Sequence, residues 1–435
     1  MTGGSAHGGV GPVDRPGDVA FQGKSGINVF WPWGGPIVAN SGDPNTRYAP
    51  ADVVFGPLAN GPWDDHVTRS VYDQCVAVGI DHFRIQCNPG PWMQAIREND
   101  RAYMEALFAR FDATIEHTLE AGLGVVVDPY LTGYVRDAPA TVLTAFDRRD
   151  GRRTPGFLAY RAALAAFAER YQKYDPALVA FELFNEPPDP EQFSGDWPNV
   201  LQPELYRTVR AIAPRHTIVC TGARWSSIPE LCALDPSSYD RNVLWTIHPL
   251  IPAPASQQGY PYSQYKYVVG IHYPPRPEDK SGAIDDMHRR VSADETLGPH
   301  RKAALRDSLT GDLNAYFDTP QGLAWINAQF DLASNWCRRH AIPPASIYVG
   351  EYGVTRSNQG FPGTRMAGYQ GGAREDRARY LRDLRSAIGV HGFRCAPDHL
   401  DTLDYGLTQA ADARIGPWDP LLLSAISPHD VRLTF

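Results

Sequence analysis

Short apolar segments alternate with amphipathic helical stretches along most of this 435-residue chain, and this alternation restricts the possible folds more than any other feature. Segments with the length and composition of β-strands lie at residues 25–30, 82–86, 124–128, 178–184, 217–221, 242–247, 346–350 and 392–396. Most are continuous apolar runs, which is typical of parallel strands covered on both faces. Apolar residues recur at helical spacing at residues 67–78, 103–121, 156–174, 203–213, 321–340 and 374–390. The pattern predicts an α/β fold of the (β/α)8 TIM-barrel type.

An open, doubly wound sheet is the alternative fold, but no glycine-rich phosphate loop follows the first strand. The tripeptide Gly23-Lys24-Ser25 resembles the end of a P-loop. However, Asp18 stands where that loop requires its first glycine, and a strand rather than a helix follows. We therefore favour the barrel.

The chain is expected to form one barrel domain, because no linker or internal repeat divides it. Residues 1–24, which begin with a Gly- and Pro-rich stretch, are predicted to be a flexible N-terminal segment, and residues 25–435 the catalytic barrel. Residues 249–319 follow the sixth strand and are too many for an ordinary βα loop, so we expect a subdomain inserted at the barrel mouth.

The N-terminus lacks the pattern of a secretory signal. We expect a cytoplasmic protein, or a secreted one if the native gene encodes a signal that this sequence lacks.

Charge and composition exclude several classes of partner and cofactor. The net charge is -8 and there is no run of Lys and Arg, which argues against a nucleic-acid partner. The apolar runs fall far short of the ~20 residues of a membrane-spanning helix. The six cysteines form no CxxC pair and there is no HExxH motif, so we expect buried free thiols and neither a metal nor another cofactor. The sequence leaves the oligomeric state open.

Two glutamates follow expected strands at the end of a barrel where active sites form. Glu186 comes directly after the strand at 178–184, and Glu351 after the strand at 346–350. The carboxyl ends of all barrel strands meet at one mouth, so we expect these two carboxylates to face one another. Glycoside hydrolysis requires such a pair: one carboxyl protonates the departing oxygen, and the other attacks the anomeric carbon or activates water. Their surroundings must set their pKa values apart.

The segments around these glutamates resemble a known family. Asn185-Glu186-Pro187 after one strand, with Gly350-Glu351-Tyr352-Gly353 after another, is similar to glycoside hydrolase family 5, whose members are cellulase-like, retaining β-glycosidases on a (β/α)8 barrel. The resemblance extends from about residue 26 to about residue 426. It implies that Glu186 is the general acid/base, that Glu351 is the nucleophile and that Asn185 holds the sugar 2-hydroxyl.

Two further segments carry the resemblance. Residues 79–85 are similar to the second strand of the family, which implies that Arg84 lies behind the nucleophile and keeps Glu351 ionised. Residues 242–248 are similar to the sixth strand, which implies a substrate-binding role for His248; His272 falls in the insertion instead. We interpret Glu182, four residues before Glu186, as structural support paired with an arginine.

The chain departs from the family at three supporting positions. Tyr130 stands where the family has a histidine after the third strand, and Leu250 where it has a tyrosine that hydrogen-bonds the nucleophile. The eighth strand and its end, residues 393–398, offer no tryptophan for the sugar. We hypothesise that Tyr130 supplies the lost hydroxyl and binds substrate, and that Arg394 or Asp398 reaches the substrate.

Aromatic side chains at strand ends suit a sugar cleft, because the C–H faces of sugars stack on aromatic rings. Trp31 and Trp33 follow the first strand, Trp92 the second and Trp225 the fifth. We predict Trp31 and Trp225 to bind substrate. Ordinary core packing is the alternative for each of these tryptophans.

These observations together predict a retaining glycoside hydrolase that cleaves β-glycosidic bonds in a β-glucan, an oligosaccharide or a β-glycoside by double displacement. A transglycosylase with the same two glutamates is one alternative, since it differs only in which acceptor reaches the intermediate. A non-catalytic carbohydrate-binding barrel is the other, suggested by the three altered positions. If the insertion at 249–319 closes one end of the cleft, exo action is favoured. Sugar and linkage stay open.

Overall fold

The computed structural model describes residues 18–30, 36–38, 53–55, 69–130, 153–187, 197–261, 263–357, 370–400, 405–408 and 418–427. In this part of the chain, eight strands form one parallel sheet in the order β1-β4-β5-β6-β7-β8-β9-β10. They are β1 (Gly26–Phe30), β4 (His82–Cys87), β5 (Gly124–Pro129), β6 (Val179–Glu182), β7 (Thr217–Thr221), β8 (Val243–Ile247), β9 (Ile347–Val349) and β10 (Arg394–Cys395). β2 (Pro36–Val38) and β3 (Val53–Phe55) pair separately and antiparallel.

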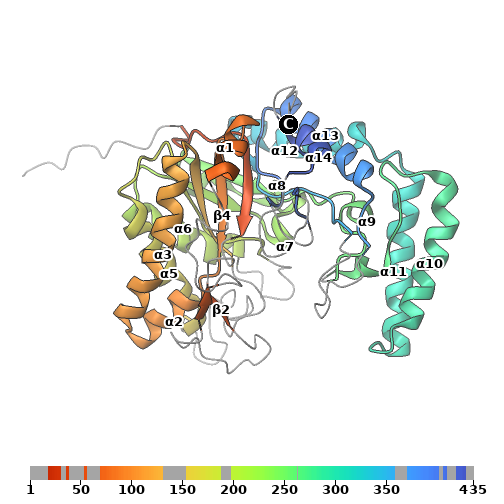
Figure 1. Cartoon of the computed structure of the whole chain (residues 1–435), viewed down its shortest axis with the longest axis horizontal. Helices are drawn as coiled ribbons and strands as arrows, with labels where there is room; N and C mark the ends of the chain where they lie inside the picture. Colours follow the sequence, from red (N-terminus) through yellow and green to blue (C-terminus); the bar gives the residue numbers. More distant parts are fainter. Residues whose placement is uncertain are drawn as a thin grey trace, which may run out of the picture.

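The sheet closes on itself and forms the barrel that the sequence predicts. A parallel bridge between Ser25 and Cys395 joins β10 to β1, and the amide of Cys395 donates to the carbonyl of Lys24 at 3.0 Å. One observed strand lies at each expected strand segment. Six of the eight strands agree with the expected bounds to within one residue at each end, and β6 and β10 are shorter than expected. Figure 1 shows β1 and β4 running in the same direction, toward the lower side of the molecule in this view. That side is the barrel mouth.

Helices cover the outside of the barrel. The six expected helices are present as α1 (Arg69–Ala77), α3 (Arg101–Glu120), α5 (Pro155–Tyr171), α6 (Gln202–Ile212), α12 (Leu323–His340) and α13 (Arg374–His391). Shorter elements complete the shell: α2 (Gly90–Glu98), η3 (Trp197–Leu201), α7 (Ala223–Ser226), α8 (Ile228–Ala233), η4 (Pro236–Ser238), η7 (Pro344–Ser346) and α14 (Pro420–Ile426). α2, α3, α5 and α6 lie on one side in Figure 1, and α12 to α14 at the top.

Local signals explain where several of these helices begin and end. The Asp100 carboxylate accepts from the amide of Tyr103 at 3.0 Å, which caps the start of α3. Thr154 caps α5 in the same way, ahead of a proline in the first turn. Gly392 ends α13 with a φ of 69°, a left-handed conformation that glycine adopts without steric cost.

Side chains alternate between two apolar regions along each strand. On β5, Val125 and Val127 belong to the core between barrel and helices, whereas Val126 points into the barrel. The interior cluster also includes Phe21, which is buried at the end of the barrel opposite the mouth. Residues 18–24 therefore pack across the barrel bottom. They lie within the stretch 1–24 that was expected to be a flexible segment, and they cover the apolar interior at the end opposite the mouth.

The expected insertion at 249–319 is built largely of helices. It holds α9 (Ala253–Ser256), η5 (Gln264–Tyr267), η6 (Pro277–Asp279), α10 (Lys280–Ala293) and α11 (Pro299–Asp318). α10 and α11 pack as a hairpin beside the barrel and reach past it on the mouth side (Figure 1). His272 contacts Asp376 at 2.7 Å, and the Tyr273 hydroxyl donates to Asp383 at 2.9 Å, so the insertion is anchored on α13.

None of the helices in the described ranges is long and apolar enough to span a membrane. All six cysteines lie in these ranges as free thiols, and five of them are buried, as the sequence predicts.

Candidate active site

A fully buried arginine organises the part of the barrel interior that lies next to the mouth. Arg84 extends from β4 and donates from Nε and Nη2 to both carboxylate oxygens of Glu182, at 2.7 and 2.8 Å. Its Nη1 donates to Glu351 at 2.8 Å, and its Nη2 to the side-chain oxygen of Asn185 at 2.8 Å. A third carboxylate, Asp128, lies 2.9 Å from Nη2. The structure confirms Glu182 as an arginine-paired support, and the planar fork of Arg84 fixes Glu351 relative to Asn185.

This cluster holds more acid than base. Asp128, Glu182, Glu186 and Glu351 lie together around the single guanidinium of Arg84. Burial disfavours the charge on Arg84, but the neighbouring carboxylates raise its pKa well above the usual value, so it stays charged. Burial also raises the pKa of Asp128 well above its usual range, despite the attraction of Arg84. Burial therefore opposes a negative charge on Asp128, and the Arg84 guanidinium partly offsets this effect.

Glu351 follows β9 at the mouth. Gly350 precedes it where no side chain fits, because a Cβ atom there would lie 2.3 Å from the Thr246 hydroxyl. The Asn28 amide donates to the Gly350 carbonyl at 2.7 Å, while the Asn28 oxygen accepts from Arg84. Burial raises the pKa of Glu351, but charge-assisted donation from Arg84 opposes this shift.

Glu186 lies opposite, after β6, with an unusual backbone. Its φ is 41°, a left-handed conformation that costs a non-glycine residue roughly 1–2 kcal/mol. His248 Nδ1, at the end of β8, lies 2.9 Å from Glu186 and 3.4 Å from Glu351. Burial raises the pKa of Glu186 to about 7 and lowers the pKa of His248 to about 4. Only Glu351 of the two glutamates is hydrogen-bonded to Arg84 in the structure, so we expect Glu351 to ionise before Glu186.

The pKa of Glu186 predicts a pH profile. A general acid must be protonated, so kcat/KM on a substrate with a poor leaving group should fall as the pH rises through about 7. His248 does not titrate in this range, because its pKa is lowered to about 4. The measurement is kcat/KM between pH 5 and 9. A dinitrophenyl glycoside is the control, since its leaving group needs no proton and its profile should lack this limb. A limb shared by both substrates would contradict the assignment.

A turn with a left-handed backbone connects the segment that carries Glu186 to the segment that carries His248. Arg224, Trp225 and Ser226 all have φ between 48° and 57°, in α7 after β7. The amide of Trp225 donates to the Pro187 carbonyl at 2.9 Å, and the Ser226 carbonyl accepts from the amide of His248 at 2.9 Å. The turn thus ties the segments of Glu186 and His248 together, and it leaves Trp225 51% exposed.

The structure brings five of the expected site residues into one network: Arg84, Asn185, Glu186, His248 and Glu351. Tyr130 lies half-buried just past β5, with its amide donating to the Cys87 carbonyl at 2.7 Å. Trp225 lies at the mouth, on the turn described above. Trp31 and Trp33 lie outside the described residues.

Two residues that the sequence analysis considered for the substrate site, Trp92 and Arg394, lie elsewhere. Trp92 is fully buried on α2 and packs against Phe108 and Phe167, so it belongs to the core and does not line a sugar cleft. Arg394 points into the bottom of the barrel, where it donates to the carbonyls of Ala345 and Phe21. It therefore lies at the end opposite the mouth and does not reach a substrate there.

Sequence reasoning missed three polar residues of the site. Gln86 donates to Glu351 Oε1 at 2.6 Å, and His399 contacts Gln86 at 2.6 Å. Asp128 contacts Arg84. A signal for Gln86 was present: side chains alternate along a strand, so the residue two positions after Arg84 must also point inward.

Glu186, His248 and Glu351 could each offer one ligand atom to a metal ion. These atoms lie within 4.8 Å of one another in the described part of the chain. However, Arg84 already supplies a cation 2.8 Å from Glu351. That positive charge disfavours a second cation at the same carboxylate.

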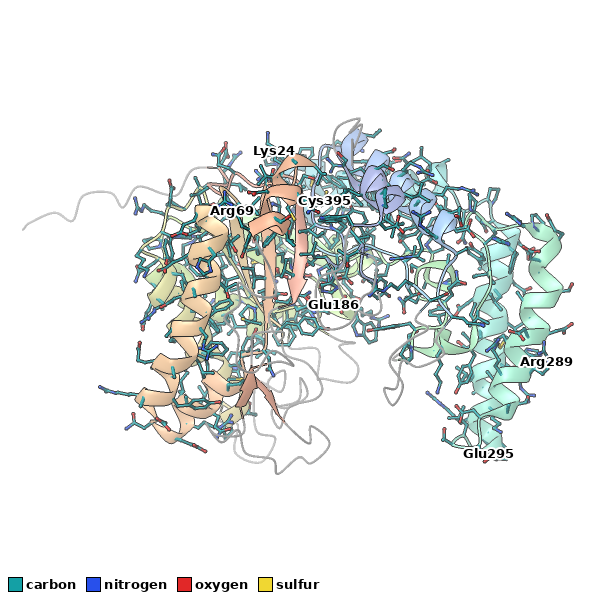
Figure 2. All side chains as sticks on the ribbon, viewed as in Figure 1. Lys24, Arg69, Glu186, Arg289, Glu295 and Cys395 are labelled. Atoms are coloured by element: carbon teal, nitrogen blue, oxygen red, sulfur yellow. The ribbon has the colours of Figure 1, made fainter. Side chains whose placement is uncertain are left out.

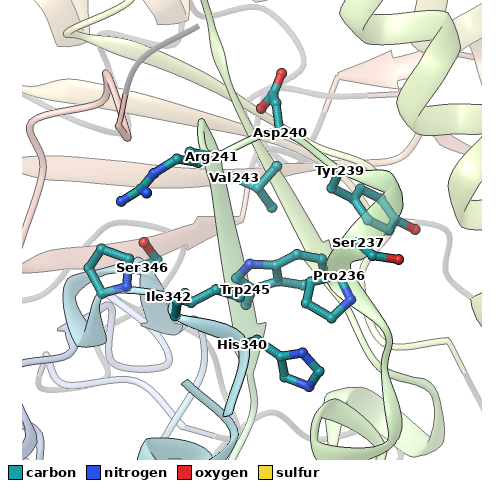
Figure 3. Close-up of a pocket in the computed structure, with 12 residues that line it drawn as sticks. Pro236, Ser237, Tyr239, Asp240, Arg241, Val243, Trp245, His340, Ile342 and Ser346 are labelled. Atoms are coloured by element: carbon teal, nitrogen blue, oxygen red, sulfur yellow. The ribbon is translucent and has the colours of Figure 1, made fainter. Parts of the chain in front are cut away.

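A separate hollow of about 330 Å³ lies at the other end of the barrel. It opens beside the first residues of β8 and beside Ser346, just before β9, so it faces the barrel bottom (Figure 3). Its lining includes Pro236, Tyr239, Arg241, Trp245, His340 and Ile342. Figure 2 shows Glu186 at the lower end of the strands, on the mouth side. The hollow is therefore separate from the carboxylate pair.

Comparison with known proteins gives a family match. The model of the cellulase family, glycosyl hydrolase family 5, matches residues 51–383. No match is found among curated proteins.

Solved structures share the fold. Cel5A from Thermotoga maritima, in complex with cellobiose, is 19% identical with a TM-score of 0.57, and the match covers 92% of this chain and 97% of that chain. The same protein in complex with mannotriose is 19% identical with a TM-score of 0.58, covering 94% and 98%. The cellulose synthase subunit Z from Clostridioides difficile is 18% identical with a TM-score of 0.57, covering 93% and 99%.

Proposed function

The chain belongs to glycosyl hydrolase family 5, and from this membership we propose that it is a retaining hydrolase of β-glycosidic bonds that acts by double displacement. One observation carries the proposal: an oxygen of Glu186 and an oxygen of Glu351 lie within 4.8 Å of each other across the mouth. Retaining enzymes keep their carboxyl groups ~5–5.5 Å apart, whereas inverting enzymes leave ~6.5–9.5 Å for a water molecule. The short separation supports direct attack by a carboxylate.

In the first step, Glu351 attacks the anomeric carbon while Glu186 protonates the departing oxygen. The raised pKa of Glu186, about 7, suits a group that must carry a proton near neutral pH. Arg84 and Gln86 donate to Glu351 Oε1. This leaves Glu351 Oε2 as the atom that bonds to the sugar.

In the second step, Glu186 has given up its proton and removes one from an incoming water. The water attacks the anomeric carbon, Glu351 leaves, and the product keeps its original configuration. Neutral His248 can donate to ionised Glu186 or accept from protonated Glu186 at the same 2.9 Å contact, so it holds Glu186 in place through both steps.

Substrate recognition is proposed for side chains at the mouth. Asn185 Oδ1 accepts from Arg84, so the Asn185 amino group is oriented to donate to the sugar 2-hydroxyl. The exposed Trp225 ring offers a surface for stacking on a sugar. The similar structures with cellobiose and mannotriose support a β-linked oligosaccharide as the substrate class.

The stereochemical outcome tests the proposal. We expect proton NMR to show the β-anomer as the first product released from p-nitrophenyl β-glycosides and from β-linked oligosaccharides, before mutarotation. Initial release of the α-anomer would show inversion and overturn the double displacement. Binding without turnover on the whole panel would favour a carbohydrate-binding barrel. Products longer than the substrate would show transglycosylation.

A further inference from the structure

The nucleophile has a second hydrogen-bond donor that is itself held from the far side. Gln86 is fully buried at the inner face of β4, and its Nε2 donates to Glu351 Oε1 at 2.6 Å. Its Oε1 lies 2.6 Å from Nε2 of His399. The Gln86 side-chain amide therefore connects two segments of the barrel mouth. It contacts the end of β9 through Glu351 and the segment after β10 through His399.

The chemistry of the three side chains decides which atoms donate and which accept in the hydrogen bonds from His399 through Gln86 to Glu351. An ionised carboxylate only accepts, so Gln86 must direct its amino group toward Glu351. Its carbonyl oxygen then faces His399 and can only accept, so His399 must carry a proton on Nε2. On its other side, Nδ1 of His399 contacts the carboxylate of the adjacent Asp398. The neutral ring with its proton on Nε2 and the imidazolium both provide this donor.

Within the described residues, four titratable groups are placed close to His399. Asp398 precedes it, Glu351 lies beyond Gln86, and Glu186 and His248 are close enough to interact with its charge. His248 is neutral at pH 7, because burial lowers its pKa to about 4. Asp398 is itself buried, with its backbone amide donating to the Tyr352 carbonyl at 2.9 Å. The imidazole is thus held between a carboxylate and an amide.

We propose that His399 is a positioning residue for the nucleophile, acting through Gln86: it locks the Gln86 amide with its donor toward Glu351 and strengthens that hydrogen bond. This inference rests on the proposed function of Glu351. Hydrogen bonds in a chain polarise one another, so a donor at Gln86 Oε1 makes the Gln86 amino group a better donor. The consequence is a carboxylate that ionises more readily and leaves more readily in the second step.

The test measures the protonation of Glu351 directly and needs no substrate. Carboxyl ¹³C NMR gives the pKa of Glu351, with its signal assigned by its absence in Glu351→Gln. We expect His399→Phe to raise this pKa by about one unit, and Gln86→Leu by at least as much. His340→Phe, at the C-terminal end of α12 and at the barrel bottom, is the matched control and should leave it unchanged.

A double variant separates relay from direct charge. If His399 acts through Gln86, adding His399→Phe to Gln86→Leu produces no further shift. Additive shifts would overturn the relay and assign the effect to the charge of His399 alone. No shift in either single variant would overturn the proposal altogether. His399→Gln keeps a donor and should recover at least half of the shift; it also serves if His399→Phe does not fold.

Kinetics then connect the relay to turnover. On a substrate that wild type cleaves, the acidic limb of kcat/KM should move upward in His399→Phe by the same amount as the NMR titration. An unchanged limb with a shifted NMR pKa would leave the relay intact but remove Glu351 from the nucleophile role. The two failures are therefore distinguishable.

Discussion

Replacing Glu351 by Gln is expected to reduce kcat/KM on activated aryl β-glycosides by at least about 10⁴-fold. The amide cannot attack the anomeric carbon, so the covalent intermediate does not form. The fold should survive, because the oxygen of the introduced amide can still accept from Arg84 at the position of Glu351 Oε1. The measurement is kcat/KM alongside thermal unfolding. We expect the unfolding midpoint to stay within a few degrees of wild type.

Glu375→Gln is the matched control for this change. Glu375 lies exposed in the first turn of α13, outside the carboxylate network, and its replacement should leave kcat/KM near wild type. Retention of more than a tenth of the activity in Glu351→Gln would contradict the nucleophile assignment. It would point to water attack or to another carboxylate.

Replacing Arg84 by Met is expected to lower the free energy of unfolding by about 3–5 kcal/mol and to abolish detectable turnover. The guanidinium is fully buried between Asp128, Glu182 and Glu351, at 2.7 to 2.9 Å. Without it, these buried carboxylates lose their only direct cation in the described structure. The free energy is measured by urea denaturation at pH 7. We expect part of the loss to be recovered at lower pH, as the carboxylates take up protons.

Two further variants serve as controls for Arg84→Met. Arg69→Met removes an exposed arginine that pairs with Asp73 at 3.0 Å, and it should change stability by less than about 0.5 kcal/mol. Arg84→Lys keeps the charge but not the planar fork, so it should retain more stability than Arg84→Met while still losing most of the activity. An Arg84→Met protein as stable as wild type would show that the carboxylates are already neutral.

The sequence predicts the barrel and the centre of its site for a clear physical reason. Parallel strands bring their carboxyl ends to one mouth, so a residue such as Glu186 or Glu351 that directly follows an apolar run has its position fixed by topology alone. Arg84 lies inside a strand, and its alternation in register decides that it points inward. The positions of Glu186, Glu351 and Arg84 follow from the strand pattern of the sequence and from the rule that parallel barrel strands end at one mouth.

Other parts depend on how distant segments meet. Gln86 and His399 come together only because the barrel closes between its first and last strands, and no local pattern contains that contact. Trp92 follows a strand as a cleft residue would, but α2 turns it into the core. The left-handed turn at Trp225 contains no glycine at its three positions, so its sequence gives no signal for that conformation.

Mechanism-based labelling identifies the residue that attacks the sugar. The protein is incubated with a panel of 2-deoxy-2-fluoro β-glycosides that carry activated leaving groups, and intact and peptide masses are recorded. We expect one fluoroglycosyl adduct on the peptide that contains Glu351, and none in Glu351→Gln. Turnover of the matching unfluorinated glycoside, with no adduct or with an adduct on another residue, would contradict this expectation.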